Sequence, residues 1–290
     1  MANVKELKKR IKTTKGTLKI TSAMKLVSAA KLAKAQIAIQ NARPYASELN
    51  STIKVVSALA QNYTHPFLKE HKGNKAIILV ISSDKGLCGS YNGTLSKKVL
   101  NFIKDNPETD FKVYFIGKKA KELISKSVSN VGTHYKFAKV VPTYSELKDV
   151  AEELSSLYSE GEAQKVYVAY NIFISAISLE PAVSQLLPMT LPLEEKQRLE
   201  KEFPFDFEYE PSGKEILDAL IPQAYVTTIY TALLDAVAAE HGARMSSMEN
   251  ATQNCKELVY SLSLEMNKLR QENITTELIE VVSGAESVNN

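Results

Sequence analysis

The sequence has little of what metal sites, disulfide frameworks and membrane spans are made from. Its only cysteines are Cys88 and Cys255, and none of its four histidines has a metal-like or triad-like neighbour. The sequence therefore indicates neither a disulfide framework nor a zinc site, and it favours a reducing compartment. The longest unbroken apolar run, 76–81, is far shorter than the roughly 20 residues of a membrane-spanning helix. The start MANVKELKKR lacks the apolar core of a signal peptide. We expect a soluble protein that holds no metal and no cofactor.

Proline and glycine are scarce at both ends of the chain. There is no proline from Met1 to Arg43 or from Gln223 to Gly284. Apolar residues return in these segments mostly at intervals built from three and four: Val4, Leu7, Ile11, Leu18, Met24 and Val27 in the first, and Leu233, Val237, Met248, Cys255, Leu258, Leu262, Leu269, Leu278 and Val282 in the second. This spacing predicts one apolar stripe on each of two long helices. Helices over 3–60 and 213–285 would be roughly 85 Å and 110 Å long, too long for a compact domain of this size.

The two ends carry opposite charge. Residues 1–43 hold 11 Lys and Arg against one acidic residue, and residues 213–290 hold 5 against 11. An antiparallel coiled coil of the two ends would bury both stripes, with a thin seam because alanine, serine and threonine interrupt the large apolar residues. Two alternatives stay open: a helical hairpin that stabilises a globular core, and a basic helix that serves as a nucleic-acid arm.

The interior of the chain alternates strands with helices. The sequence predicts strands over 75–81, 111–116 and 166–170, and helices over 95–104, 118–126 and 145–158, followed by an irregular run marked by prolines at 181, 188, 192, 204 and 211. This is the pattern of a small α/β sheet. The predicted fold is α+β: a long antiparallel coiled coil of residues 1–60 and 212–286 with a Rossmann-like α/β insert over 75–205.

A glycine loop follows the first predicted strand. Its sequence, SDKGLCGSYN over 83–92, lacks the Lys-Ser/Thr of a phosphate-binding loop and is not GxGxxG. We interpret it as a tight turn between strand and helix and expect no nucleotide site there.

Four separated segments closely resemble the gamma subunit of F-type ATP synthases. They are RIKTTKGTLKITSAMKLVSAAKLAKAQ (10–36), SDKGLCGSYN (83–92), YNIFISAIS with PAVSQLLP (170–188), and EHGARMSSMENATQNCKELVYSLSLEMNKLRQENITTELIEVVSGA (240–285). The resemblance runs nearly end to end and keeps the order of the segments. The family's architecture is also a coiled coil of the two termini with an α/β domain between them.

The resemblance implies a non-catalytic rotor shaft. In the family, the coil lies within a ring of alpha and beta subunits, and the α/β domain lies on the c-ring beside the epsilon subunit. The shaft couples proton flow to ATP synthesis or hydrolysis by rotation. A start without a transit peptide favours a bacterial protein on the cytoplasmic face of the inner membrane, attached only through the complex. The insert lacks the paired cysteines of the chloroplast version, so we expect no thiol switch.

The resemblance also implies which residues contact partners. The motif RQENITTE carries Arg270, Gln271, Thr275 and Glu277, which match family residues that contact a loop of a beta subunit. Met24 and Lys25 match the region that faces the moving lever of beta, with Arg244 expected close by across the coil. The apolar tip, held in a collar at the top of the ring, corresponds to Leu278, Ile279, Val281 and Val282. Gly242 departs from the family pattern and would cost a helix roughly 1 kcal/mol.

Overall fold

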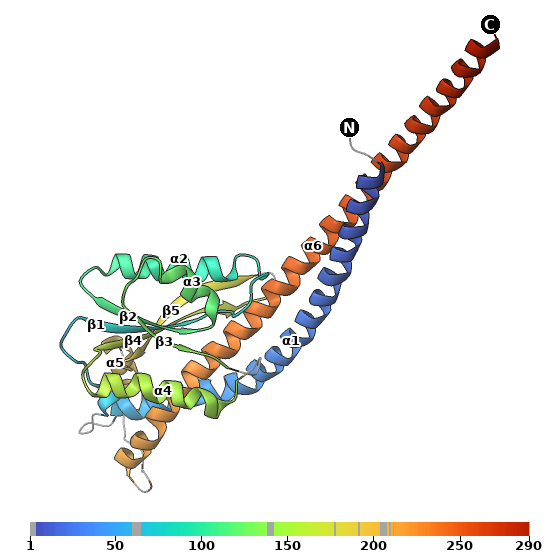
Figure 1. Cartoon of the computed structure of the whole chain (residues 1–290). Helices are drawn as coiled ribbons and strands as arrows, with labels where there is room; N and C mark the ends of the chain where they lie inside the picture. Colours follow the sequence, from blue (N-terminus) through green and yellow to red (C-terminus); the bar gives the residue numbers. More distant parts are fainter. Residues whose placement is uncertain are drawn as a thin grey trace. The chain divides into compact units, whose positions relative to one another are not determined.

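The computed structural model describes residues 4–59, 65–137, 142–176, 178–190, 192–203, 208, 210 and 212–289. Two long helices hold the ends of the chain: α1, Val4–Leu59, and α6, Gly213–Asn289 (Figure 1). A mixed α/β segment lies between them in the sequence. The predicted fold class, two long terminal helices with an inserted α/β segment, is confirmed.

The α/β segment is built on a five-stranded sheet. Its strands are β1 (Lys75–Ile81), β2 (Asp110–Ile116), β3 (Val131–Tyr135), β4 (Lys165–Phe173) and β5 (Leu179–Leu187), in the order β3-β2-β1-β4-β5. β1 pairs in parallel with β2 and β4, and β2 pairs in parallel with β3. β5 is the one antiparallel strand, paired with β4 at the edge. The run KAIILVI of β1 is central and almost completely buried, as expected of a strand covered on both faces.

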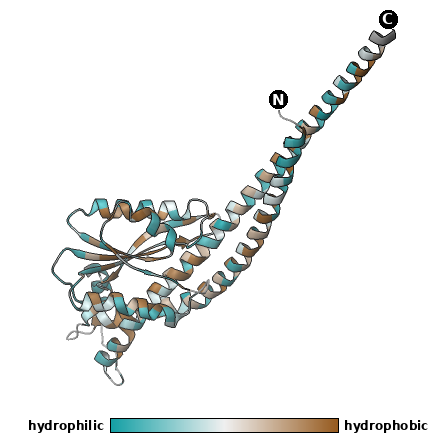
Figure 2. Cartoon of the chain, in the orientation of Figure 1, coloured by the Kyte–Doolittle hydropathy of each residue, from teal (hydrophilic) through white to brown (hydrophobic). Residues whose placement is uncertain are grey.

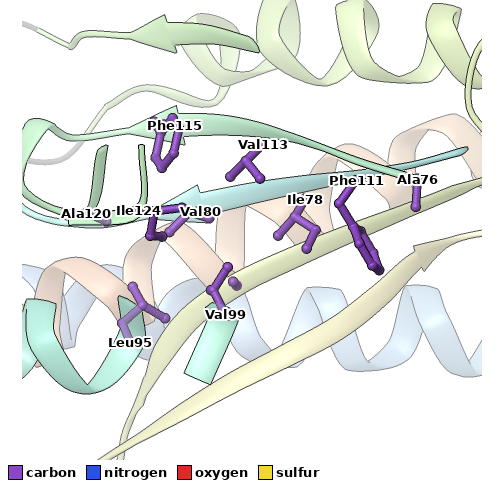
Figure 3. Close-up of a cluster of buried hydrophobic side chains, with 11 residues drawn as sticks. Ala76, Ile78, Val80, Leu95, Val99, Phe111, Val113, Phe115, Ala120 and Ile124 are labelled. Atoms are coloured by element: carbon purple, nitrogen blue, oxygen red, sulfur yellow. The ribbon is translucent and has the colours of Figure 1, made fainter. Parts of the chain in front are cut away.

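Helices cover both faces of this sheet. The helices α2, Tyr91–Asp105, and α3, Lys118–Ile124, lie on one face, and α4, Tyr144–Ser159, lies on the other (Figure 1). Figure 3 shows side chains of β1, β2, α2 and α3 pointing toward one another in one core, which includes Ile78, Phe115, Leu95 and Ile124. A short 3-10 helix, Pro66–Leu68, precedes β1.

The prediction of an irregular run after residue 170 is wrong. β4 continues to Phe173, β5 contains Pro181, and the helix α5 spans Leu193–Glu202. Proline fits β5 because an edge strand leaves one row of backbone groups without a partner strand, where a missing N–H costs little. The strand β3 was not predicted either, and its Gly132 lies against the ring of Tyr114, where a Cβ would come within 2.7 Å. Pro204 and Pro211 lie outside the described residues.

Packing divides the chain into two compact units. One comprises residues 28–244, and the other comprises 1–27 with 245–290. Both divisions fall inside the long helices, because parts of α1 and α6 belong to the same unit as the sheet. The division into 1–60, 75–205 and 212–286 follows the sequence elements instead and stays a prediction. Within the described residues, no helix combines the length and the apolar character needed to cross a bilayer.

Candidate functional site

The two helices pair along a heptad seam in the unit formed by 1–27 and 245–290. A series in steps of three and four residues passes only through partly or fully buried positions: Leu7, Ile11, Thr14, Leu18, Thr21 and Lys25 on α1, and Met245, Met248, Thr252, Cys255, Val259, Leu262, Met266 and Leu269 on α6. Leu7, Ile11 and Leu262 form a small apolar cluster. Thr21 and Thr252 hydrogen-bond across the seam with their hydroxyl oxygens 2.9 Å apart. Leu7 and Ile11 contact Leu262, whereas Thr21, later on α1, contacts Thr252, earlier on α6. The two helices are therefore antiparallel.

Four positions of the predicted stripes are exposed, and two of them, Leu278 and Val282, lie beyond Leu269, the last position of the seam. Val27 is 55% exposed and Leu258 is 46% exposed, whereas Thr21 and Thr252 are buried. On α1 a repeat of seven residues from Leu7 passes through Thr21 and misses Val27, and on α6 the repeat from Met245 passes through Thr252 and misses Leu258. The seam therefore contains threonine side chains at positions where hydrophobicity alone would predict the more apolar Val27 and Leu258.

Opposite charges meet across the helices, as the charge difference between the ends predicts. Lys25 forms an ion pair with Glu249, and Arg43 Nη2 lies 2.8 Å from Asp235 Oδ1. The side chains of Lys25 and Glu249 are 39% and 49% exposed. Because water screens such pairs, each is worth about 1 kcal/mol or less, and the charges select the partner and direction more than they stabilise the coil.

Arg244 is buried in the unit that contains the sheet. Its Nη1 lies 2.6 Å from Glu240 Oε1, Nη2 donates to the carbonyl oxygen of Lys85 at 3.0 Å, and Nε donates to that of Gly86 at 3.3 Å. Its side chain is 9% exposed. The sequence reasoning placed Arg244 near Met24 and Lys25, but it missed these contacts with the glycine loop. The loop and the EHGARM segment are far apart in the sequence, and no spacing rule joins them.

The neighbours of Arg244 have shifted pKa values. Burial raises the pKa of the Glu240 carboxyl group, although Arg244 opposes this effect. Burial, followed by the charges of Arg244 and Lys31, lowers the pKa of His241 to about 4. His241 is therefore neutral at pH 7.

The glycine loop is held by its own side chains. Asn92 Oδ1 accepts a hydrogen bond from the backbone N–H of Ser83 at 3.2 Å, and Asn92 Nδ2 lies 3.2 Å from the sulfur of Cys88. Ser83 Oγ lies 2.8 Å from the carbonyl oxygen of Lys85. Leu87 has φ of 64° and its side chain is 62% exposed. No cluster of His, Cys, Asp and Glu side chains suited to a metal ion occurs within the described residues.

The last part of α6 is exposed to solvent in the described structure. Every residue from 270 to 285 is exposed. The seam ends at Leu269, and the next positions of the repeat are polar: Asn273, Thr276, Glu280 and Ser283. Figure 2 shows hydrophobic and hydrophilic residues interspersed along this end of α6.

The predicted partner residues lie on this exposed end. Arg270, Gln271, Thr275 and Glu277 are all exposed, and Thr275 Oγ1 donates to the backbone carbonyl of Gln271 at 2.9 Å. The four residues of the apolar tip are 57% to 69% exposed. An isolated helix with this much apolar surface in water indicates a surface that another molecule covers.

Comparison with known proteins identifies the family. The family model described as ATP synthase matches residues 3–288. The chain is 38% identical to the ATP synthase gamma chain of Geotalea daltonii and 37% identical to that of Halothermothrix orenii. Each match covers 99% of this chain, and they cover 99% and 100% of those relatives.

Solved structures share the fold. A chain of the mitochondrial ATP synthase of Euglena gracilis, solved with its OSCP, F1 and c-ring, matches with a TM-score of 0.69 and 17% identity, over 98% of this chain and 94% of that one. A chain from the central stalk and c-ring of the Tetrahymena thermophila enzyme matches with a TM-score of 0.60 and 24% identity, over 80% of this chain and 99% of that one. From its end-to-end identity with these bacterial relatives, the chain belongs to the ATP synthase gamma chain family.

Proposed function

We propose that this chain is the central rotor shaft of an F-type ATP synthase and couples ion flow to ATP synthesis or hydrolysis by rotation. The observation that carries the proposal is the match to gamma chains over 99% of the sequence. The paired helices also suit a shaft, because a helix pair resists bending better than a single helix. The alternative of a nucleic-acid arm has no support in these matches.

The chain's part in this function is mechanical. To move a partner's two-state equilibrium from 1:99 to 99:1, a shaft must favour one state by about 5.5 kcal/mol. A surface that differs from one side to the other supplies such a preference as it turns. We infer that catalysis belongs to the alpha and beta subunits and that this chain is not an enzyme by itself.

The first proposed contact is with a loop of a beta subunit, through Arg270, Gln271, Thr275 and Glu277. The exposure of all four supports it, as does their spacing on the helix. Gln271 and Thr275 are four residues apart, and Arg270 and Glu277 are seven apart, so they line adjoining stripes of one face.

The second proposed contact is the collar around the apolar tip, made by Leu278, Ile279, Val281 and Val282. Apolar contact is non-directional, so it lets a shaft slip past its bearing as it turns. The exposure of these side chains supports this role.

Met24 and Lys25 are proposed to face the moving lever of beta. Both are partly exposed, and Lys25 forms an ion pair with Glu249. Arg244 belongs to the same proposal, but its guanidinium group already serves carbonyl oxygens of its own chain. Direct contact between Arg244 and beta would require those bonds to be exchanged.

The remaining proposed partners are the epsilon subunit and the c-ring, which would contact the α/β segment and the adjoining ends of the long helices. Through them the chain would lie on the cytoplasmic face of a bacterial inner membrane. The membrane association is proposed to be peripheral and indirect.

Co-expression with the cognate alpha and beta subunits tests the function. We expect the chain to copurify in a ring complex and to raise its ATPase activity well above that of alpha and beta alone. The copurification is then repeated at rising salt concentration with bulk DNA as competitor. Nucleic-acid binding weakens steeply as the salt concentration rises, whereas we expect the complex with alpha and beta to persist. Salt-sensitive DNA binding without an ATPase partner would refute the proposal.

A further inference from the structure

We propose that Arg244 is a positioning residue of a latch that fastens the glycine loop 83–92 to α6. The latch comprises Arg244 and Tyr91 with the backbone carbonyl groups to which they donate, and Glu240, which pairs with Arg244. Its role is to make the sheet and α6 turn as one body, and this part of the proposal rests on the rotor function above.

The guanidinium group of Arg244 reaches across to the loop. Its planar fork donates to two successive carbonyl oxygens, those of Lys85 and Gly86, at 3.0 and 3.3 Å. Its third side is paired with Glu240 Oε1 at 2.6 Å. An arginine can be buried there because the carboxylate neutralises its charge and other N–H groups donate to the carbonyl oxygens; His241 Nδ1 also lies 3.2 Å from Nη1. Lysine, with one compact ammonium group, cannot reproduce this planar set of contacts.

Tyr91 makes a second attachment to α6 at Ala236, about two helical turns before Arg244. Its hydroxyl donates to the carbonyl oxygen of Ala236 in α6 at 3.0 Å, and the side chain is 1% exposed. Around it, Cys88 and Ala239 pack in one apolar cluster with Phe173. The strip of α6 from Ala236 to Arg244 is therefore joined to the loop by both polar and apolar contacts.

Gly242 lies in the same strip. A Cβ at this position would come within 3.2 Å of Ala176 Cα, in the segment after β4. The glycine is thus explained by the close approach of backbone to helix, and the strip is a site of tight packing.

The position of the latch explains why it matters. The sheet segment is joined covalently to the long helices before β1 and after α5, whereas the loop 83–92 follows the opposite, C-terminal end of β1. Arg244 lies 31 residues beyond the start of α6 at Gly213, which is about 46 Å of helix at about 1.5 Å per residue. An attachment this far along α6 from the covalent connections resists tilting of the sheet relative to α6 with a long lever arm, and so keeps the two together when either turns.

Leu87 shows that the loop is held and not merely resting there. Its φ of 64° lies in the left-handed region, which leucine rarely adopts. Such conformations persist where surrounding contacts enforce them. The bonds from Arg244 and Ser83 to the carbonyl groups immediately before Leu87 are those contacts. Without Arg244, we expect the loop to relax and to uncover Cys88, the next residue.

Thiol labelling tests the latch on the isolated full-length chain. Cys88 is buried and Cys255, in the other unit, serves as an internal reference. With a maleimide and mass spectrometry of each cysteine, Arg244→Ala should raise the labelling rate of Cys88 by about tenfold or more, because local opening controls its access. The rate at Cys255 should stay constant. Arg43→Ala, which removes a different ion pair to α6, is the matched control and should leave Cys88 protected.

A second variant guards against general unfolding. Tyr91→Phe keeps the buried ring and removes only the hydrogen bond to Ala236, so it should raise Cys88 labelling by a smaller factor. If Arg244→Ala exposes both cysteines, the protein has unfolded more generally, and the labelling rate of Cys88 in Tyr91→Phe then tests the latch. Unchanged Cys88 labelling in Tyr91→Phe and in any folded Arg244→Ala protein would overturn the latch, whatever the function of the chain.

The coupling consequence has its own readout. In the reconstituted complex, Arg244→Ala and Tyr91→Phe should lower the number of ions pumped per ATP hydrolysed, with the order of the two effects matching the order of Cys88 exposure. Raised Cys88 labelling with an unchanged pumping ratio would overturn the coupling role.

Discussion

Replacing Arg270 and Gln271 together by alanine should leave the fold intact and impair coupling. Both side chains are exposed, on a part of α6 where every residue from 270 to 285 is exposed. Exposed substitutions of this kind change the free energy of unfolding by about 0.5 kcal/mol or less, and alanine favours a helix. The bond from Thr275 to the backbone carbonyl of Gln271 does not depend on the replaced side chain.

The expected effect on coupling follows from the contact that Arg270 would make. A hydrogen bond to a charged group is worth about 1.5 to 3 kcal/mol. Set against the roughly 5.5 kcal/mol that a decisive switch requires, its loss removes a quarter to a half of the preference. If that energy appears in the barrier, turnover falls by about 10- to 150-fold.

The assay is steady-state ATP hydrolysis and ATP synthesis by the reconstituted complex, each divided by the amount of assembled complex. Lys268→Ala is the matched control, because Lys268 lies on the same segment, is 80% exposed and pairs only loosely with Glu272 at 3.9 Å. It should keep turnover near that of the unmodified complex. Normal turnover in both directions for the double variant would mean that Arg270 and Gln271 are only a solvated face.

Three further predictions concern stability, measured by thermal or denaturant unfolding of the isolated chain. Leu262→Ala should cost about 2 to 3 kcal/mol, the low end for a buried leucine in a small cluster, whereas Leu258→Ala, one helical turn earlier at an exposed position beside the seam, should cost about 0.5 kcal/mol or less. Because burial holds the pKa of His241 at about 4, below its ordinary 6.5, the unfolded chain binds the extra proton. The free energy of unfolding should therefore fall as the pH drops from 6.5 toward 4, by at most about 1.4 kcal/mol per pH unit, and His241→Asn should lose this pH dependence. The same slope of unfolding free energy against pH in the variant and the unmodified chain would contradict the prediction. Gly242→Ala should not gain the roughly 1 kcal/mol that helix propensity offers, because its methyl group meets Ala176; a full gain would show that the strip is loosely packed.

Local signals predicted most elements of the fold. The buried run KAIILVI is β1, and the proline-free ends with their three- and four-residue spacing lie in α1 and α6. The strand with Pro181 was missed because proline is a poor strand residue everywhere except at an edge, and its place at an edge depends on which strands pair. The exposed positions of Arg270 and Gln271 agree with a partner surface, and their contact with beta stays a prediction.

The sequence by itself determined that two long helices of opposite charge enclose an α/β segment, because helix periodicity, strand composition and charge are properties of neighbouring residues. Only the tertiary structure decided which faces are buried. The heptad register puts Thr21 against Thr252 and leaves Val27 in solvent, since each helix presents to its partner only the positions that the register selects. The tertiary structure also joined Arg244 to a loop that lies 158 residues earlier in the chain. A buried charged side chain needs hydrogen-bonding partners, and those of Arg244 include carbonyl groups from a distant part of the sequence. No local sequence pattern predicts that these groups come together.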